Sequence, residues 1–192
     1  MGIVNLSGGQ AQGATVNNGG TENIYSAGTA TQTYLNISGA QNVYSGGTAL
    51  STTVQGTQSI KAGGLAISGF VSANGLQVVS SAGIASAITL FVGTQTVLSG
   101  GTATNITISA NGDQIINGGG YVSGVTLLAY GAQEIQSGAS VTATTVSAGA
   151  SQVINVGGQA ISSILSGGIQ SISSGGTAVS TTVASTGIQN IF

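Results

Sequence analysis

The sequence contains no cysteine, proline, tryptophan or histidine, and only 2% of its 192 residues are charged. Without cysteine there is no disulfide framework and no thiolate metal site. Lys61 is the sole base, and the acids are Glu22, Asp113 and Glu134. Catalytic nucleophiles, acids and bases come mainly from residue types that are missing or scarce here. We therefore expect a protein that is not an enzyme and that holds no cofactor or metal ion.

The shortage of charge also limits the partners. The formal net charge is −2, and without a basic patch to replace phosphate counterions we expect no nucleic-acid partner. Long apolar runs are missing too, because Gly, Ser, Thr and Asn interrupt every apolar stretch. This excludes transmembrane helices and direct membrane insertion. A nearly uncharged surface also lacks the repulsion that keeps many proteins apart, so it is compatible with self-association.

What the sequence does have is a repeat of about 19 residues that runs from end to end. Its anchor is a Gln column whose members lie 17 to 19 residues apart, with Glu22 in the same slot one repeat earlier: Gln41, Gln58, Gln77, Gln95, Gln114, Gln133, Gln152, Gln170 and Gln189. Two residues after each anchor comes a β-branched residue, from Ile24 and Val43 to Ile172 and Ile191. Small apolar residues follow at the eighth position and Leu, Ile or Val at the thirteenth, with a Gly pair or near-pair between the first two columns.

This pattern predicts an all-β fold, a parallel β-helix of about ten rungs with one repeat per coil. Residues 95–108 alternate with period two on both sides of a Gly pair, and such short strands cannot form independent hairpins at one constant period. Equivalent strands would instead stack in parallel about 4.8 Å apart, giving a rod on the order of 50 Å long. Right-handed winding is the general preference for parallel connections. The Gln column shares parity with the β-branched column, which predicts an inward amide ladder.

Two other repeat folds fail on the same pattern. An α-solenoid needs more than about 30 residues per repeat and disfavours Gly and β-branched residues. An up-and-down barrel needs strands of about 10 residues, and Gly interrupts these after four to six. The repeat covers essentially residues 1–192, so we expect one β-helical repeat domain.

Two segments carry a resemblance to a known family. The stretches GAQNVYSGGTALSTTV at residues 39–54 and SGGTAVSTTV at residues 174–183 combine the Gln-x-Val spacing, a Gly-Gly-Thr-Ala turn and a Ser-Thr-Thr-Val strand. They resemble the passenger repeats of AIDA-type self-associating autotransporter adhesins, and the resemblance extends over nearly the whole chain. No basic and apolar leader precedes the repeats, so no signal peptide is visible. We therefore expect an excised piece of a passenger, without the translocator barrel, or a stand-alone repeat protein.

The resemblance implies a non-enzymatic surface protein of Gram-negative bacteria that mediates adhesion, autoaggregation and biofilm formation. It places the protein outside the cell or at the outer membrane. The implied partners are other copies of the chain, host-cell or bacterial surfaces, and a glycosyltransferase that adds heptose to Ser or Thr hydroxyls. A structural stalk, an ice-binding-like polar solenoid and a polysaccharide-processing β-helix enzyme are alternatives.

Two sets of hydroxyls are candidate glycosylation acceptors. One set precedes the Gly turns and the other lies twelve residues after the anchor, with outward parity: Ser45, Ser99, Ser137 and Ser174; Thr53, Thr107, Thr126, Thr145 and Thr182. The serines are also interpretable as turn-capping hydroxyls. For the threonines, β-propensity with solubility is the simpler interpretation, and lateral self-association and ice binding are alternatives to glycosylation. Asp113 and Glu134 lie near equivalent positions of adjacent repeats and form the one candidate catalytic pair, for which solvated surface acids are the simpler interpretation.

Overall fold

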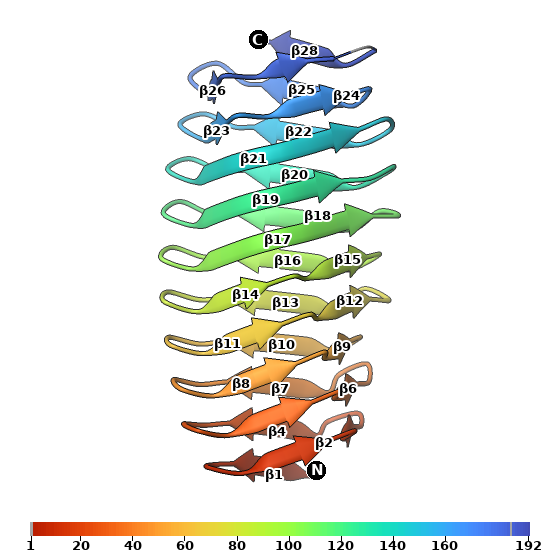
Figure 1. Ribbon diagram of the computed structural model, residues 1–192, viewed down its shortest axis with the longest axis vertical. Helices are drawn as coiled ribbons and strands as arrows, with labels where there is room; N and C mark the ends of the chain where they lie inside the picture. The colour runs from red at the N-terminus through yellow and green to blue at the C-terminus, as the bar shows by residue number, and fades with distance from the viewer. Residues whose placement is uncertain (1, 185) are drawn as a thin grey trace.

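The computed structural model describes residues 2–184 and 186–192, which form a rod of stacked parallel β-coils (Figure 1). In these ranges the regular structure consists of 28 strands arranged in two sheets, one of 11 strands and one of 17. No helix in them is long and apolar enough to cross a membrane. The all-β parallel solenoid predicted from the repeat is confirmed. Ten complete coils are present, and the last strand begins an eleventh.

The first sheet has one four-residue strand from every coil. Its members are β1 (Ile3–Leu6), β4 (Thr21–Ile24), β7 (Ala40–Val43), β10 (Thr57–Ile60), β13 (Leu76–Val79), β16 (Thr94–Val97), β18 (Asp113–Ile116), β20 (Ala132–Ile135), β22 (Ser151–Ile154), β25 (Ile169–Ile172) and β28 (Ile188–Ile191). Neighbouring strands pair in parallel and in the register of the repeat, so that Gln58 pairs with both Gln41 and Gln77.

The second sheet is bent, and most coils contribute two strands to it. The strands before the bend are β2 (Gln10–Gln12), β5 (Thr29–Thr31), β8 (Thr48–Leu50), β11 (Leu65–Ile67), β14 (Ile84–Ser86), β23 (Gln159–Ile161) and β26 (Thr177–Val179). Those after it are β3 (Thr15–Val16), β6 (Tyr34–Leu35), β9 (Thr53–Val54), β12 (Phe70–Ser72), β15 (Thr89–Phe91), β24 (Ile164–Ser166) and β27 (Thr182–Val183). In three central coils one strand runs through the bend: β17 (Thr102–Ser109), β19 (Tyr121–Leu127) and β21 (Ser140–Ser147).

The coils wind with a right-handed sense. In Figure 1 the nearer strands such as β17 and β21 run from left to right, the farther strands such as β18 run back, and the chain climbs with each circuit. The predicted hand is therefore confirmed. The bend in the second sheet is made by a left-handed residue, with φ of 54° at Ser51 and 55° at Asn105. Such residues cost backbone energy, and the flanking ladders hold them in place.

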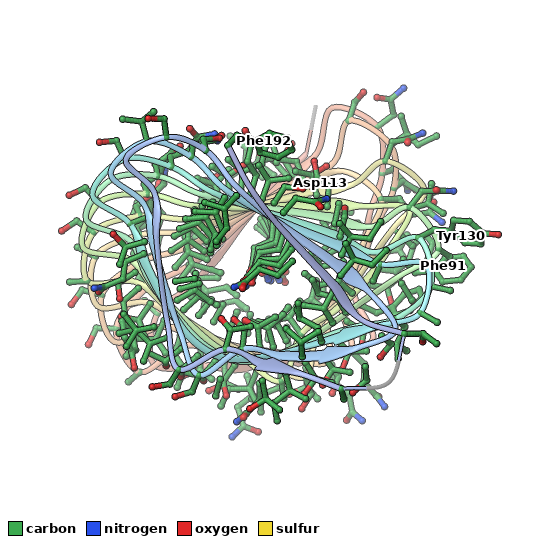
Figure 2. All side chains as sticks on the ribbon, turned by 90° about the horizontal axis from the view of Figure 1, so that it is seen from above. Phe91, Asp113, Tyr130 and Phe192 are labelled. Carbon is green, nitrogen blue, oxygen red and sulfur yellow. The ribbon has the colours of Figure 1, made fainter. Side chains whose placement is uncertain are left out.

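The core consists of inward columns, which Figure 2 shows superposed along the axis. Ile and Val of the first sheet meet a column of Ala or Val before the bend and a column of Leu, Ile or Val after it. The buried apolar residues include Ile24, Val43, Ile60, Val79, Val97, Ile116, Ile135 and Ile154; Ala30, Ala49, Ala66, Ala85, Ala103, Val122 and Ala160; and Leu35, Val54, Val71, Leu90, Ile108, Leu127, Val146 and Leu165. The hydrophobic effect of this stack is the main stabilising term of the fold.

The predicted Gln ladder runs through this core and has one direction. Each amide Nε2 donates to the Oε1 of the Gln one coil earlier, as from Gln114 to Gln95 at 2.6 Å and from Gln133 to Gln114 at 2.7 Å. The first donor, Gln41, reaches Glu22 Oε2 at 2.7 Å. The Gln side chains from Gln41 to Gln170 are almost completely buried. The ladder is therefore a structural element and no binding groove.

A second polar column was not predicted. The residue eleven after the anchor also faces inward, and where it carries a hydroxyl it donates to the anchor of its own coil. Thr33 donates to Glu22 at 3.1 Å and Ser163 to Gln152 at 3.1 Å. Thr52, Thr144 and Thr181 make the same bond. These hydroxyls use the second lone pair of the anchor oxygen.

Candidate functional site

The predicted serine acceptors lie at the turn that leads from the first sheet into the second. This turn has two residues, and the serine occupies the first. Ser45, Ser99, Ser137 and Ser174 are all exposed there, as predicted from the Gly turns. Two further exposed serines occupy the same position, and the six are named here the serine edge: Ser26, Ser45, Ser81, Ser99, Ser137 and Ser174.

The turns of the serine edge are fixed by hydrogen bonds along the rod. The Gly46 N–H donates to the carbonyl of Gly63 in the next coil at 2.9 Å, and Gly100 donates to Gly119 at 2.8 Å. The second turn residue has a left-handed backbone, with φ of 72° at Gly46 and 73° at Gly100. Glycine adopts this conformation without a steric penalty. The turns therefore form a rigid row with about 4.8 Å between coils. Ala62, Gly118 and Val156 hold the serine position in three coils, so only Ser26 and Ser45, and Ser81 and Ser99, come from adjacent coils.

Five of the six serines, all but Ser174, also lie against the turn glycine of the following coil. A Cβ atom built on Gly63 would lie 2.7 Å from Ser45 Oγ, and one on Gly119 would lie 2.5 Å from Ser99 Oγ. Ser137 has the same relation to Gly157, at 2.6 Å. The serine hydroxyl thus occupies space that only glycine leaves open. The Gly pairs in the sequence therefore have a second role beyond turn geometry, which is to make room for the serine of the preceding coil.

The predicted threonine acceptors lie elsewhere, on the outer face of the bent sheet after the bend. Thr89 pairs with Thr107, Thr107 with Thr126 and Thr126 with Thr145. We name the column Thr53, Thr89, Thr107, Thr126, Thr145 and Thr182 the threonine column. Thr182 is exposed and the others are half-buried. Phe70 and Ile164 interrupt the column, so it offers a shorter regular array than the sequence pattern suggests.

The two acceptor classes therefore differ in access. A serine of the edge projects from a turn, whereas a threonine of the column lies in a flat sheet between neighbours above and below. An enzyme that transfers a sugar must reach the hydroxyl oxygen, and the turn position allows this without displacing a strand. From the sequence, Ser26 groups with the serines that precede the Gly turns, whereas Ser81 was missed, because it is followed by Ala82 and a single Gly.

Asp113 and Glu134 lie on adjacent strands of the first sheet, β18 and β20, on its outer face. Burial raises the pKa of the Asp113 carboxyl above its usual value, and the nearby charge of Glu134 raises it further. Glu134 accepts a hydrogen bond from Asn155 Nδ2 at 2.7 Å. Within residues 2–184 and 186–192 no group of three or more His, Cys, Asp or Glu side chains is placed to hold a metal ion.

The comparisons with known proteins give matches among solved structures but not among families or curated proteins. No protein-family model matches the chain, and no curated protein matches it. Among solved structures, a TibA fragment hyper-glycosylated by TibC superposes with a TM-score of 0.67 and 28% sequence identity, over 100% of this chain and 85% of that one. The chain therefore shares its β-solenoid fold, along its whole length, with a glycosylated protein. The assignment to the AIDA-type family remains a prediction.

Proposed function

We propose that this chain is a non-enzymatic, surface-displayed adhesive solenoid whose serine edge is O-glycosylated by a transferase of the TibC kind. The observation that carries the proposal is the row of six exposed turn serines. The chain that presents them is 28% identical in sequence, over 100% of its length, to a fragment that TibC glycosylates. The proposed location is the bacterial cell surface, with host or bacterial surfaces as the adhesive partners.

The regularity of the edge supports recognition of the scaffold by the enzyme. Every serine of the edge follows an equivalent strand of the first sheet and opens an equivalent two-residue turn. All of these turns except that of Ser174 donate the same axial hydrogen bond to the next coil. A transferase that recognises one turn can therefore move to the next without a change of geometry. Multiple sugars in register would then make many weak contacts, and their avidity would exceed the affinity of any single contact.

Among the predicted acceptors we favour the serines over the threonines. Ser45, Ser99, Ser137 and Ser174 are exposed at turns, and Ser26 and Ser81 join them. The threonine column has the simpler role of an outward face with high β-propensity. A plain structural stalk differs from this proposal because it predicts no modification at either set.

The experiment is intact mass spectrometry of the chain after co-expression with TibC. The wild-type chain should gain a ladder of sugar-sized mass additions. A variant with all six serines of the edge replaced by alanine should lose most of them, whereas a matched variant with the threonine column replaced by valine should keep them. Circular dichroism checks that both variants fold. Additions that survive in the serine variant and disappear in the threonine variant would reverse the assignment, and no additions to the wild-type chain would contradict glycosylation by such an enzyme.

A further inference from the structure

The N-terminal part of the first sheet carries a block of polar and aromatic side chains on its outer face. Two outward columns cross this face, one at the residue after the Gln anchor and the other two residues further on. Over the coils of β1, β4, β7 and β10 these columns hold three asparagines, two tyrosines and the sole base of the chain. We name this block the amide–tyrosine face: Asn5, Asn23 and Asn42; Tyr25, Tyr44 and Lys61.

The three asparagines form a hydrogen-bonded ladder along the rod. Asn23 Nδ2 donates to Asn5 Oδ1 at 2.9 Å, and Asn42 Nδ2 donates to Asn23 Oδ1 at 2.9 Å. Each bond uses one of the two N–H groups of one amide and one of the two lone pairs of the next. The ladder thus fixes the amides and leaves a second donor and a second acceptor in each coil. Sugar hydroxyls both donate and accept, so a row of hydroxyls matches a row of such amides.

The two tyrosines stand beside this ladder on the same face, because each follows its asparagine by two residues. The rings of Tyr25 and Tyr44 are stacked, with centroids 4.7 Å apart and 11° between their planes. Tyr25 is 37% exposed, and the position before it in the column holds the small, exposed Ser7. Ring faces carry negative potential, which attracts the polarised C–H groups of a pyranose. Equivalent positions in other coils hold Ser80 and Ser173, so the fold itself does not require rings here.

Lys61 follows Tyr44 in the tyrosine column, and none of the acids in the described part of the chain pairs with it. Glu22 is buried on the inner side of the sheet, where its carboxylate ends the Gln ladder. Asp113 and Glu134 share the outer face with Lys61 but lie three and four coils further on. Even the nearer acid is about 14 Å away along the axis, beyond the Debye length of about 8 Å at physiological ionic strength. An unpaired ammonium beside rings and amides favours a ligand with negative charge.

We propose that the amide–tyrosine face binds an oligosaccharide that carries carboxylate groups and lies along the rod. This inference rests on the adhesive part of the proposed function and names the class of its ligand. Pyranose units repeat at nearly the spacing of the coils, which is about 4.8 Å, so successive hydroxyls meet successive amides. The tyrosine rings pack against the sugar rings, and the Lys61 ammonium binds a carboxylate. Asp113 and Glu134 repel the same ligand, which confines it to the N-terminal coils.

The test is saturation-transfer NMR on the unglycosylated full chain, followed by titration to obtain dissociation constants. Sialyllactose and tetragalacturonate are the carboxylated probes, and lactose and methyl-esterified tetragalacturonate are their neutral counterparts. At least one carboxylated probe should bind more tightly than its neutral counterpart. A preference for sialyllactose would indicate glycans of animal cell surfaces, and a preference for tetragalacturonate would indicate polysaccharides of uronic acids. Either preference supports the site.

Substitution of the two rings tests whether the probes bind at this face. Tyr25→Ser combined with Tyr44→Ser, which copies the serine of other coils, should abolish saturation transfer to all probes. Tyr121→Thr is the matched control, because it removes an exposed tyrosine from the bent sheet and copies its strand neighbour Thr102. This control should bind like the wild-type chain. Circular dichroism checks that both variants remain folded.

Substitution of the base tests the role of charge. Lys61→Asn copies Asn117, which holds the equivalent position three coils later. It should weaken binding of the carboxylated probes about two- to fivefold, as expected for an exposed ion pair, and leave the neutral probes unchanged. Added salt should weaken the wild-type chain toward the affinity of the variant.

The outcomes separate this inference from the function on which it rests. Absence of saturation transfer to every probe, or transfer that the double tyrosine substitution leaves intact, would exclude the amide–tyrosine face as a sugar site. Equal affinities of the wild-type chain and Lys61→Asn for the carboxylated probes would exclude recognition of an anionic sugar. Glycosylation of the serine edge is measured independently by mass, and adhesion of cells that display the chain would persist if another ligand is used.

Discussion

At the scale of the residue, Glu22 gives the Gln ladder its end. Every Gln donates toward the N-terminal end, so the final member must accept without donating, and Glu22 Oε2 does so from both Gln41 and Thr33. Its other oxygen, Oε1, is buried without a hydrogen-bond partner. In the preceding coil the ladder position is Val4, which has no polar side chain to offer. The ladder thus combines a satisfied carboxylate oxygen with an unsatisfied one.

This asymmetry predicts effects of very different size on stability for two isosteric changes. Gln114→Glu removes the N–H that binds Gln95 Oε1 and places two acceptors face to face, and we expect a loss of about 2–4 kcal/mol at neutral pH. Glu22→Gln removes a buried carboxylate whose Oε1 binds nothing, so we expect a change within about 1 kcal/mol. Urea denaturation of both variants measures this.

The pH dependence provides the control for that prediction. A protonated carboxyl at position 114 donates like the amide it replaces, so the folded state raises its pKa. The folded state then binds the proton more tightly than the unfolded state, and stability falls as pH rises through the folded pKa. The loss of unfolding free energy in Gln114→Glu should therefore be smaller at acidic pH than at neutral pH. A deficit of equal size at all pH values would indicate a packing defect instead of a lost donor.

Asp113 gives a second prediction in which the stability of the folded chain falls as the pH rises. Its carboxyl has a raised pKa because of burial and the charge of Glu134. Asp113 therefore favours the folded state when protonated, and this contribution is lost as pH rises through the folded pKa. Asp113→Asn should raise the melting temperature at pH 7, and the gain should vanish near about pH 3, where the wild-type carboxyl is protonated in both states. A melting-temperature difference independent of pH would contradict this account.

At the scale of the element, the turn at the serine edge predicts a coupling between coils. Gly119 and Gly138 have similar left-handed backbones, with φ of 80° and 76°, but only Gly119 lies against a serine. A Cβ on Gly119 would meet Ser99 Oγ at 2.5 Å, whereas one on Gly138 would meet nothing closer than 3.5 Å. Gly138→Ala should cost about 1 kcal/mol from backbone strain alone, and Gly119→Ala should cost more.

A double-mutant cycle isolates the contact. Gly138 lies against Gly118 of the preceding coil, and Ser99→Gly gives Gly119 the same kind of neighbour. In the Ser99→Gly background, Gly119→Ala should therefore lower the unfolding free energy by no more than Gly138→Ala does. The coupling free energy between Ser99 and Gly119 should then be about 1 kcal/mol in thermal or urea denaturation. Additive effects would mean that the serine moves aside at no cost.

The elements also show how far the sequence alone leads. The anchor, the β-branched column and the Gly turns predict coil length, parallel stacking and inward parity, because one period constrains every coil at once. The continuous strands β17, β19 and β21 could not be predicted, since their bend residues Asn105, Gly124 and Ala143 have no shared composition. The hydroxyl bonds of Thr33 and Ser163 were missed for a related reason. The equivalent position holds Gly69, Ile88 or Val125 in other coils, so no shared residue type marks this column in the sequence.

The sequence predicts where the candidate acceptor hydroxyls lie, but it does not predict which of the two sets is more accessible. Turn serines and outward threonines both follow from parity, whereas access depends on neighbours in other coils. Thr107 is half-buried because Thr89 and Thr126 lie directly beside it, and Ser99 is exposed because its neighbour is a glycine. Local patterns do not record which residues the winding brings together, so the structure was needed to separate the two sets.

At the scale of the whole molecule, the rod presents two different edges. In Figure 1 the turns that carry the serine edge lie on the left, and the opposite corner, after β15, lies on the right. The two edges are separated by the width of the sheets, so sugars on one would leave the other free. Modification of the serine edge is therefore compatible with contacts at the opposite corner, and the serines can be replaced without changing the core.

The repetition of equivalent coils along the rod predicts that one whole coil can be removed without unfolding the chain. Thr94 and Asp113 are paired equivalents on neighbouring strands, so deleting residues 95–113 joins Thr94 to Gln114 with every column in register. Because each coil contacts mainly its neighbours, we expect a folded chain whose denaturant m-value falls by about a tenth, in line with the surface lost.

A smaller deletion is the control, and it should do more damage. Deleting residues 95–104 joins Thr94 to Asn105, which puts a left-handed bend residue in the slot of the Gln ladder and moves the following inward residues out of register. Such a slip transfers apolar side chains to the solvent face, so this shorter deletion should lose cooperative unfolding. Circular dichroism and urea titration of the two deletions decide the matter. Equal damage from both would mean that residues 95–113 contribute something beyond one repeat, since a regular solenoid depends on register more than on length.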